Sequence, residues 1–415
     1  MKTSLEQYSK EDHKIYQDNI DKDVIEISDA LISNGYQAFL VGGCIRDILL
    51  GKKPKDFDIA TDANPAEICK IFKNSRVIGR RFKIVHVYTS EKKYFEVTTF
   101  RSEASKKNHS NKFKKSNGMI KRDNVFGTIS QDAFRRDFTA NSLYLDLDSE
   151  ILHDYVNGIN DIKNKKLKLI KKPAISYQED PVRMLRAVRF ESKLDLELTD
   201  DCREAISKMA YMINNVSPFR LFDEVLKIMH SGNAVTGYKK LLKFNLFKYL
   251  FPYTHDIMEK NHIYDDFFVA ALKNTDTRIK DNLHVNPSFI YAVFLWPYFK
   301  KLEQKYSQKN SLGVDLAFQK TIDSQAKYIA IPNFFQSTIS TIWSLQDSFL
   351  NLSSRNIQYL TNLHKFRAAY DFFYIRSTMD DNLKIYADKW HEIQKKVVSK
   401  KSNQDKKRYG KRNRK

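Results

Sequence analysis

Residues 39–61, with the sequence FLVGGCIRDILLGKKPKDFDIAT, constrain the fold more than any other stretch of the chain. They predict an apolar strand that ends at Gly42-Gly43, a short helix from about Cys44 to Leu50, and a second strand that begins with Asp-Phe-Asp. Glycines between a strand and a helix let backbone N–H groups approach an anionic ligand. The stretch therefore predicts a β-α-β unit with a phosphate-binding turn.

Asp56 and Asp58 flank Phe57 in the second strand of this unit. Because strand side chains alternate, the two carboxylates are expected on one face, with Phe57 pointing into the core. Like charges repel, and a divalent cation between them makes the pair favourable; few hard oxygen ligands suit Mg²⁺. Asp56 and Asp58 are therefore candidate Mg²⁺ ligands. Arg46, one turn into the preceding helix, adds a cation for a phosphate.

The composition indicates a polyanionic partner. The chain has 415 residues, and its 71 Lys+Arg against 50 Asp+Glu give a net charge of +21. A basic tail supplies about half of this excess, because the last 21 residues hold 11 Lys/Arg against one Asp. The rest of the chain is still basic, which predicts salt-sensitive binding to a nucleic acid.

The cysteines and the hydropathy pattern limit the class of protein. Cys44, Cys69 and Cys202 are widely spaced and form no CxxC pair, which argues against zinc sites and a disulfide framework. No apolar run of 18 or more residues occurs, so no membrane segment is expected. These features predict a soluble cytoplasmic protein.

Two strand-like regions follow the β-α-β unit. Residues 76–89 predict two short strands around Arg80 and Arg81, which either face a triphosphate or the end of an RNA, or occupy an exposed turn. Residues 94–101 alternate strictly between polar and apolar side chains. In a sheet, Glu96 would reach Asp56 and Asp58 as a third carboxylate; the alternative is a solvent-facing glutamate.

Two later segments combine acidic and basic residues. In residues 132–148, Arg135 and Arg136 can neutralise a triphosphate, while Asp137 can hold a ribose hydroxyl or an arginine. In residues 175–190, Asp180 is expected to cap a helix whose first residue is Pro181.

An acidic and a basic side chain at the start of that helix are suited to recognising the edge of a nucleobase. Arg183 and Arg186 fall on one face of it, opposite the packed Val182, Leu185 and Val188. A carboxylate can accept an exocyclic amine, and a guanidinium can donate to a ring nitrogen. The alternative is a capped helix with an ion pair.

Taken together, these motifs resemble the class II nucleotidyltransferases, the family of bacterial poly(A) polymerases and tRNA CCA-adding enzymes. The resemblance covers most of residues 36–255 and is carried by LVGGCIRDILLGKKPKDFDIAT, by RRDFTAN and by an EDxxR pattern. VIGRRFKIVHV, RLFDEVLKIMHSG and LFKYLFP are similar to poly(A) polymerases, whereas CCA-adding relatives typically carry a Gly-Thr-Val type ending in place of GRRF.

The resemblance implies roles for individual residues. It implies two Mg²⁺ ions at Asp56 and Asp58, with Glu96 as a further candidate ligand and Asp137 as a third catalytic residue. The remaining roles are triphosphate binding by Gly42, Gly43, Arg46, Arg135 and Arg136, and base or ribose binding by Asn141, Glu179, Asp180 and Arg183; Arg80 and Arg81 are candidate RNA ligands.

The expected architecture is an α/β nucleotidyltransferase head with a small mixed sheet, followed by an all-helical neck, body and tail. The expected division is a polar N-terminal segment 1–22, a catalytic head 23–170, a nucleotide-base- and RNA-binding neck 171–260, an RNA-binding body 261–390 and a disordered basic tail 391–415. Aromatic side chains at helical spacing in the body are expected to form its core.

The expected activity is template-independent, Mg²⁺-dependent addition of AMP from ATP to single-stranded RNA 3′ ends, in mRNA polyadenylation and RNA turnover. RNA rather than DNA is the expected partner, and no membrane is expected. The alternative is a tRNA CCA-adding nucleotidyltransferase; a non-catalytic RNA-binding protein on the same scaffold is disfavoured by the intact Asp-x-Asp.

Overall fold

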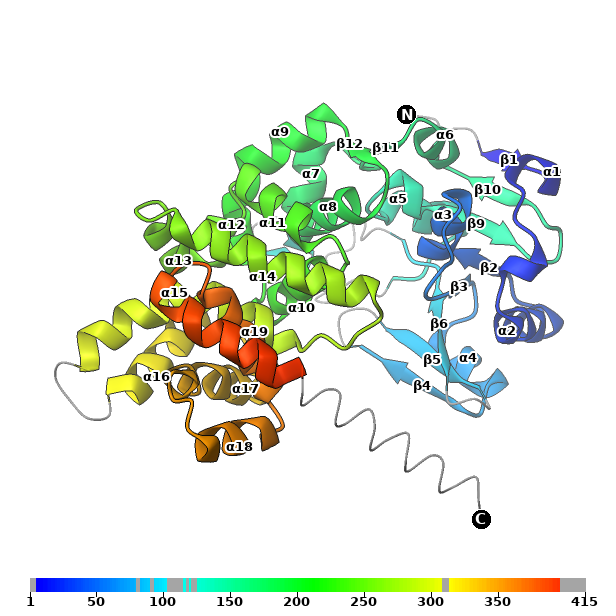
Figure 1. The fold of residues 1–415 in the computed structure, drawn as a ribbon. Helices are drawn as coiled ribbons and strands as arrows, with labels where there is room; N and C mark the ends of the chain where they lie inside the picture. The colour runs from blue at the N-terminus through cyan, green and yellow to red at the C-terminus, as the bar shows by residue number, and fades with distance from the viewer. Residues whose placement is uncertain are drawn as a thin grey trace, which may run out of the picture. The chain divides into compact units, whose positions relative to one another are not determined.

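The chain folds into two compact units, Met1–Met209 and Ala210–Lys415 (Figure 1). The computed structural model describes residues 5–79, 83–89, 93–102, 125–307 and 313–395, together with the backbone of 115–116 and 119–120. The first unit contains a mixed sheet and the second is helical, which confirms the predicted fold class.

An eight-stranded mixed sheet is the framework of the first unit. Its strand order is β1-β10-β9-β2-β3-β6-β5-β4; β3 and β6 run parallel, and the other neighbouring pairs of this sheet are antiparallel. The strands are β1 (Glu6–Tyr8), β2 (Ala38–Val41), β3 (Asp58–Thr61), β4 (Ser75–Ile78), β5 (Ile84–Tyr88), β6 (Tyr94–Thr99), β9 (Leu143–Asp146) and β10 (Leu152–Asp154). Two short pairs, β7 (Lys115–Ser116) with β8 (Met119–Ile120) and β11 (Lys166–Leu167) with β12 (Glu197–Leu198), lie outside it.

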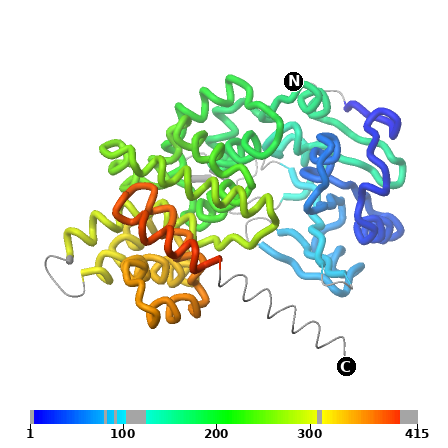
Figure 2. The backbone as a smooth tube through the Cα atoms, viewed as in Figure 1, coloured from blue at the N-terminus to red at the C-terminus, as the bar shows by residue number. Residues whose placement is uncertain are grey.

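The predicted β-α-β unit is present as β2, α3 (Gly43–Leu49) and β3, which can be followed along the blue part of the tube in Figure 2. One detail of the prediction is wrong, because β3 begins at Asp58. Asp56 precedes the strand and is exposed, and Phe57 is only half-buried. Strand alternation therefore does not place Asp56 on the same face as Asp58.

Helices α2 (Lys22–Ser33) and α4 (Pro65–Ile71) pack on the sheet. Asn64 caps α4, because its side chain accepts hydrogen bonds from the N–H groups of Ala66 and Glu67. α4 contacts β4, β5 and β6, while α2 contacts β2 and β3. These two helices leave the other face of β3, β6 and β5 to the polar side chains described below.

The helices of the first unit that follow β6 in the sequence lie beside the sheet. They are α5 (Ile129–Arg135), η2 (Thr139–Asn141), α6 (Gly158–Lys163), α7 (Pro173–Glu179), α8 (Val182–Lys193) and α9 (Asp200–Met209). The expected cap at Asp180 is wrong. Asp180 is the C-terminal cap of α7, and Pro181 occupies the N-cap position of α8, so two helices meet where one was predicted to begin.

The second unit is helical in its described part. Its elements are η3 (Ala210–Asn215), α10 (Pro218–Met229), α11 (Ala234–Lys243), α12 (Phe247–Leu250), α13 (Pro252–Met258), α14 (Ile263–Lys280), α15 (Pro287–Ser307), α16 (Gly313–Gln325), α17 (Asn333–Ser344), η4 (Asp347–Leu350), α18 (Ser354–Asn362) and α19 (Phe366–Arg376), followed by a helical segment at 381–395. The prediction that the aromatic stripes form a core is confirmed: Phe267, Phe268, Phe294 and Phe372 are completely buried.

The two terminal segments contain secondary structure that the sequence did not predict. The polar N-terminal segment contributes β1, which pairs with β10 at the edge of the sheet. The predicted tail begins within a helix, since residues 391–395 are helical and Gln394 is buried. Residues 396–415 lie outside the described part, as do Arg80, Arg81 and most of 103–124. In the described residues, no helix is both long and apolar enough to cross a membrane.

Candidate active site

The parallel pairing of β3 with β6 brings two carboxylates together. Asp58 is the register partner of Glu96, and Val41 at the end of β2 is the partner of Asp58 on its other side. Directly opposed residues on neighbouring strands have Cβ atoms about 5 Å apart. The register thus places Glu96 beside Asp58, while its reach to Asp56 and its role as a metal ligand stay predictions.

Asp58 lies in an environment that disfavours its charge. Burial raises the pKa of Asp58 to about 6, the Glu96 carboxylate adds to the rise, and Asp56 contributes in the same direction, whereas Arg136 opposes it. Asp56 is thus close enough to act on Asp58 electrostatically although it lies outside the strand. The three acids form an undercompensated negative cluster, which is the setting that favours a bound cation.

Gly42 leaves open the space between this cluster and the neighbouring arginine. Its φ of +82° is a conformation that side chains rarely adopt. A Cβ atom at this position would stand 3.5 Å from Nη1 of Arg136 and 4.0 Å from Oδ2 of Asp58. A side chain at this position would therefore be strained by its backbone conformation and would lie beside both a guanidinium and a carboxylate.

Arg136 is held in place by two residues that the sequence motifs did not single out. Its Nε donates to Tyr144 Oη at 2.8 Å, and its Nη2 donates to Asp132 Oδ2 at 3.0 Å. Asp132 is 3% exposed and also accepts from the Tyr144 hydroxyl. Two guanidinium nitrogens are thus anchored while the third, Nη1, faces Gly42. The spacing of Asp132 and Arg136 by four residues on a helix was a signal for this pair; nothing local indicated Tyr144.

A hydrogen-bond chain connects the start of α3 with α8. Nη1 of Arg46 donates to Oδ1 of Asn141, and Nδ2 of Asn141 donates to Oδ1 of Asp137. Oδ2 of Asp137 in turn accepts from Nε of Arg186 at 2.5 Å. Asp47 also accepts from Arg46. Of the two roles expected for Asp137, the structure shows that of holding an arginine, and that arginine, Arg186, was not among the predicted site residues.

The ion pair and hydrogen bonds of Asp137 keep its carboxyl group ionised. It is largely buried, and although burial alone acts against its charge, the adjacent Arg186 and the bonds from Arg186 and Asn141 hold the pKa of Asp137 well below its usual range. Its Oδ1 accepts a further hydrogen bond from the N–H of Phe138. All these bonds stabilise the carboxylate form.

The predicted base-reading residues lie where α7 meets α8. Nη1 of Arg183 donates to the Ser176 hydroxyl at 2.8 Å, and its Nη2 donates to the carbonyl oxygen of Arg135 at 3.2 Å. Glu179 is 3.6 Å from Arg183 and forms a closer ion pair with Lys171 at 2.8 Å. Arg183, which belongs to the predicted base-reading motif, thus binds the backbone of Arg135, the first residue of the RRDFTAN motif.

One aromatic ring gathers three guanidinium groups in this region. The Phe190 ring lies 5.1 Å from Arg46, 5.2 Å from Arg186 and 4.8 Å from Arg189, measured from the ring centroid to each Cζ. Burial also lowers the pKa of Lys193, the last residue of α8. The sequence suggested α8 as a packed helix with one basic face, and the stacking around Phe190 was not foreseen.

The second unit also holds a group of side chains with the spacing of metal ligands. In the described part of the chain, the group whose metal-ligand atoms all lie within 4.8 Å of one another is His255, Asp256 and Glu259, and two of its members are exposed. Asp56, Asp58 and Glu96 do not meet this spacing. Asp58 and Glu96 are neighbours through the strand register, and Asp56 acts on Asp58 electrostatically. The three carboxylates are not arranged as a compact set of metal ligands.

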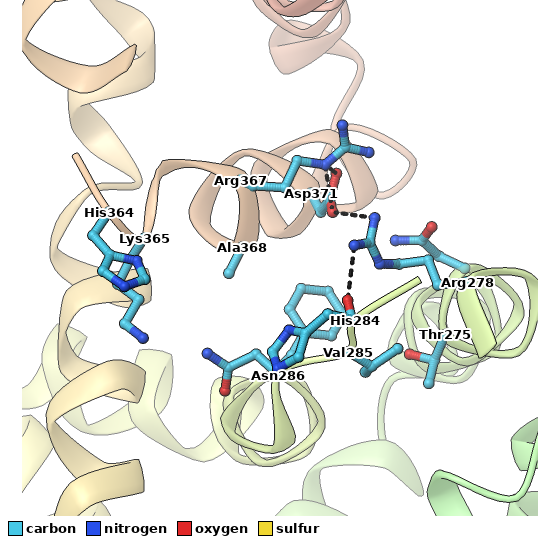
Figure 3. A pocket seen from close by; sticks show the side chains of 12 residues that line it. Thr275, Arg278, His284, Val285, Asn286, His364, Lys365, Arg367, Ala368 and Asp371 are labelled. Atoms are coloured by element: carbon cyan, nitrogen blue, oxygen red, sulfur yellow. Dashed lines mark hydrogen bonds and ion pairs between the residues drawn. The ribbon is translucent and has the colours of Figure 1, made fainter. Parts of the chain in front are cut away.

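A pocket of about 210 Å³ lies among helices of the second unit (Figure 3). In its wall Asp371 is paired with Arg367 at 2.9 Å and lies 3.9 Å from Arg278, which also donates to the carbonyl oxygen of His284. None of the predicted site residues lines this pocket. The predicted site residues all belong to the first unit.

Comparison with known families and proteins agrees with this placement. The profile of the poly A polymerase head domain matches residues 38–168, that of a probable RNA- and SrmB-binding site of polymerase A matches 195–258, and that of the arginine-rich C-terminus of polymerase A matches 307–415. Poly(A) polymerase I of Salmonella typhi is 38% identical over 395 residues, which cover 93% of this chain and 85% of that protein.

CCA-adding enzymes are also similar, over a smaller part of the chain. That of Bacillus pumilus is 34% identical over 243 residues, covering 59% of this chain and 57% of the relative. The crystal structure of the Bacillus stearothermophilus CCA-adding enzyme in complex with CTP superposes with a TM-score of 0.58 at 21% identity, covering 91% of this chain and 82% of that one, which shows a shared fold. The chain therefore belongs to the poly(A) polymerase family and is a nucleotidyltransferase.

Proposed function

We propose that this protein is a template-independent poly(A) polymerase that adds AMP from ATP to the 3′ ends of single-stranded RNA. The observation that carries the proposal is the juxtaposition of the Asp58–Glu96 pair with Gly42 and the anchored Arg136. The carboxylate of Asp58 and the guanidinium of Arg136 lie on either side of Gly42, whose φ of +82° favours a residue without a side chain. Nucleotide transfer needs both: a metal site for the reacting oxygens and a cation for the triphosphate.

Asp58 and Asp56, with Glu96 beside them, would hold the Mg²⁺ ions. When bound, two such ions lower the pKa of the attacking 3′-hydroxyl and stabilise charge on the attacking and leaving oxygens. The residues fit this role because the strand register sets Glu96 beside Asp58 and because Asp56 also acts on Asp58, so that carboxylates, the ligands that Mg²⁺ prefers, gather here. The anchored Arg136 points one guanidinium nitrogen toward Gly42, where it would neutralise the triphosphate.

The proposed roles of Arg46 and Asn141 are those of positioning. Arg46 already donates to Asp47 and Asn141, and it stacks on Phe190, so its guanidinium orientation is fixed before a nucleotide arrives. Asn141 is held from both sides by Arg46 and Asp137. A preorganised cradle of this kind costs little reorganisation during the reaction.

Asp180 and Arg183 are proposed to select adenine, with Glu179 supporting them. Arg183 has five N–H donors, and the hydrogen bonds to Ser176 and to the Arg135 carbonyl use three of them. Donor capacity is therefore left for a ring nitrogen, while a carboxylate at Asp180 would accept the exocyclic amine. Glu179, paired with Lys171, braces the end of α7.

The setting we propose is the cytoplasm, in mRNA polyadenylation and RNA turnover. The free thiols of Cys44, Cys69 and Cys202 suit a reducing compartment. The basic composition supports single-stranded RNA as the partner, with the body at 261–390 and the tail at 391–415 adding affinity to that of the neck.

The competing function is CCA addition to tRNA, which the partial match to CCA-adding enzymes favours. The two are separated by supplying the purified protein with an oligo(A) primer or a tRNA that lacks its CCA end, with Mg²⁺ and each nucleotide in turn. We expect long runs of A on the oligo(A) primer from ATP and poor use of CTP. Addition that stops after C, C and A on the tRNA would assign the protein to the alternative, and equal activity in EDTA would refute the Mg²⁺ dependence.

A further inference from the structure

The face of the sheet that carries the proposed metal site extends beyond the carboxylates. The strand registers align four polar residues in one row across β4, β5, β6 and β3: Arg76 pairs with His86, His86 with Glu96, and Glu96 with Asp58. Nε2 of His86 lies 3.5 Å from Oε1 of Glu96. The imidazole is thus the neighbour of the acidic cluster on the side away from Gly42, and Arg76 is exposed at the outer end of the row.

Three aromatic rings gather next to this row. His86 stacks on Tyr94 with centroids 4.2 Å apart and planes at 11°, and Tyr88, the register partner of Tyr94, lies 6.0 Å from it. Val85, Val87, Phe95 and Val97 alternate with these residues and are buried against the covered face of the sheet. The rings of His86, Tyr88 and Tyr94, here called the aromatic platform, therefore lie on the same face as Asp58 and Glu96.

The platform is accessible. Tyr94 is 51% exposed, and Tyr88 and His86 are partly exposed. Cross-strand aromatic pairs often serve only to stabilise a hairpin, and such a pair gains most when both rings are covered. A stack that leaves half of its outer ring in water beside a catalytic cluster is a surface on which another flat group can lie.

We infer that the aromatic platform stacks the base at the 3′ end of the RNA substrate, an inference that rests on the proposed function. Tyr94 precedes Glu96 by two residues, so it lies about 7 Å from it along the strand, which is the scale of one nucleotide step in an extended single strand. A base stacked on Tyr94 would bring its own 3′-hydroxyl toward the carboxylates. Arg76 would meet the phosphates behind it.

RNA is the fitting ligand because stacking accepts every base and needs no sequence readout. The incoming nucleotide is proposed to be read at the junction of α7 and α8, by Asp180 and Arg183. The platform, on β5 and β6, would then serve the primer. His86, which touches both Tyr94 and Glu96, would keep the stacked base and the acidic cluster at a fixed separation. These are positioning roles.

The test compares Tyr94→Ala and Tyr94→Phe in the full-length protein, with Tyr16→Ala as the matched control. Tyr16 is 49% exposed and lies in the N-terminal segment, which has no proposed binding role. We measure KM for an oligo(A) primer, KM for ATP at saturating primer, and primer affinity without ATP by fluorescence anisotropy. Loss of one stacked base predicts a roughly 5- to 100-fold rise in KM and Kd for the primer in Tyr94→Ala. The KM for ATP should stay within about twofold, and Tyr94→Phe and Tyr16→Ala should resemble the wild type.

A primer whose 3′-terminal nucleotide is abasic provides the second arm. It should weaken binding to the wild type by about the same factor as Tyr94→Ala, and the mutation should then cause little further loss, because both changes remove the same stacking interaction. Unchanged primer affinity in Tyr94→Ala, or additive losses, would overturn the inference. A rise in KM for ATP alone would assign the platform to the incoming base and overturn it as well.

Failure of the proposed function gives a different result. A wild-type protein that adds no A to the primer refutes the polymerase assignment, while the anisotropy arm still decides whether the platform binds the RNA end. Equal losses in Tyr94→Phe and Tyr94→Ala would contradict stacking, because phenylalanine keeps the ring.

Discussion

Replacing Asp58 by asparagine should stabilise the first unit at neutral pH while it abolishes nucleotide addition. Asparagine keeps the shape of the side chain and removes a charge that the fold disfavours. In the structure, burial, Glu96 and Asp56 all act against ionisation of Asp58, and only Arg136 favours it. The same charge is what the proposed Mg²⁺ site requires, so stability and activity should move in opposite directions.

The size and sign of the effect follow from the pKa of Asp58. Below about pH 4 the group is protonated in both the folded and the unfolded chain, and it contributes nothing. Its pKa rises from 3.8 in the unfolded chain to about 6 in the fold, so the folded state binds the proton more tightly and loses stability as the pH rises between these values. Above pH 6 the full cost is present, and a rise of about 2.2 in pKa corresponds to about 3 kcal/mol.

Hydrogen exchange of the amides of β3 and β6, at several pH values, measures this cost in the first unit itself. Trp296, Trp343 and Trp390 all lie in the second unit, so their fluorescence during denaturation provides an internal control that Asp58→Asn should leave unchanged. Asp148→Asn, at an exposed aspartate of the first unit, is the matched control for loss of one charge.

Asp58→Asn is expected to raise the free energy of unfolding of the first unit by about 3 kcal/mol at pH 8 and to leave it nearly unchanged at pH 4. Saturating Mg²⁺ should reduce the difference in stability between Asp58→Asn and the wild type at pH 8, because the ion stabilises the wild type and not the variant. A variant that is less stable than the wild type at pH 8, or equally stable at both pH values, would refute the reasoning that the acidic cluster is uncompensated in the absence of metal.

Three other changes test the remaining parts of the site. Gly42→Ala should raise the KM for ATP and cost roughly 1–3 kcal/mol of stability, because it forces a side chain to φ +82° beside Arg136; kinetics and denaturation measure the two effects. Asp132→Asn should destabilise the first unit by roughly 1–3 kcal/mol, since Arg136, whose side chain is 22% exposed, loses its charged partner; stability equal to that of the wild type would contradict this. Deleting residues 396–415 removes ten Lys/Arg and one Asp beyond the last described helix, so the salt dependence of RNA affinity should flatten by about 0.7 in logarithmic slope for each phosphate that these cations neutralise; identical slopes would show that this segment does not touch RNA.

The parts of the fold that the sequence predicts are those set by local pattern. The strands predicted in residues 76–89 and the alternation in 94–101 correspond to β4, β5 and β6. The proximity of Glu96 to Asp58 could be expected once both strands were assumed to be neighbours. The parallel register that makes the contact is a property of the whole sheet, and sequence periodicity does not determine it.

The errors have physical reasons of the same kind. Asp180 was expected to begin a helix because acid followed by proline is a common start, yet Pro173 begins an earlier helix that ends at Glu179, with Asp180 as its C-terminal cap. Asp56 was expected in a strand, but pairing with β2 and β6 begins only at Asp58. The helix boundary is thus set by the preceding helix, and the strand boundary by the neighbouring strands, rather than by the local pattern alone.

The contacts of Asp137 explain how the site joins residues from distant parts of the sequence. Both its oxygens are occupied, Oδ1 by Asn141 and the Phe138 N–H and Oδ2 by Arg186, and these bonds hold its pKa below the usual range, which is the opposite of what a proton acceptor in catalysis needs. We therefore propose that Asp137 acts by positioning its neighbours. Since Asn141 also binds Arg46, one carboxylate fixes a side chain at the start of α3 and another on α8. The proposed triphosphate and base sites are thereby held at a constant distance, which a polymerase that repeats the same addition requires.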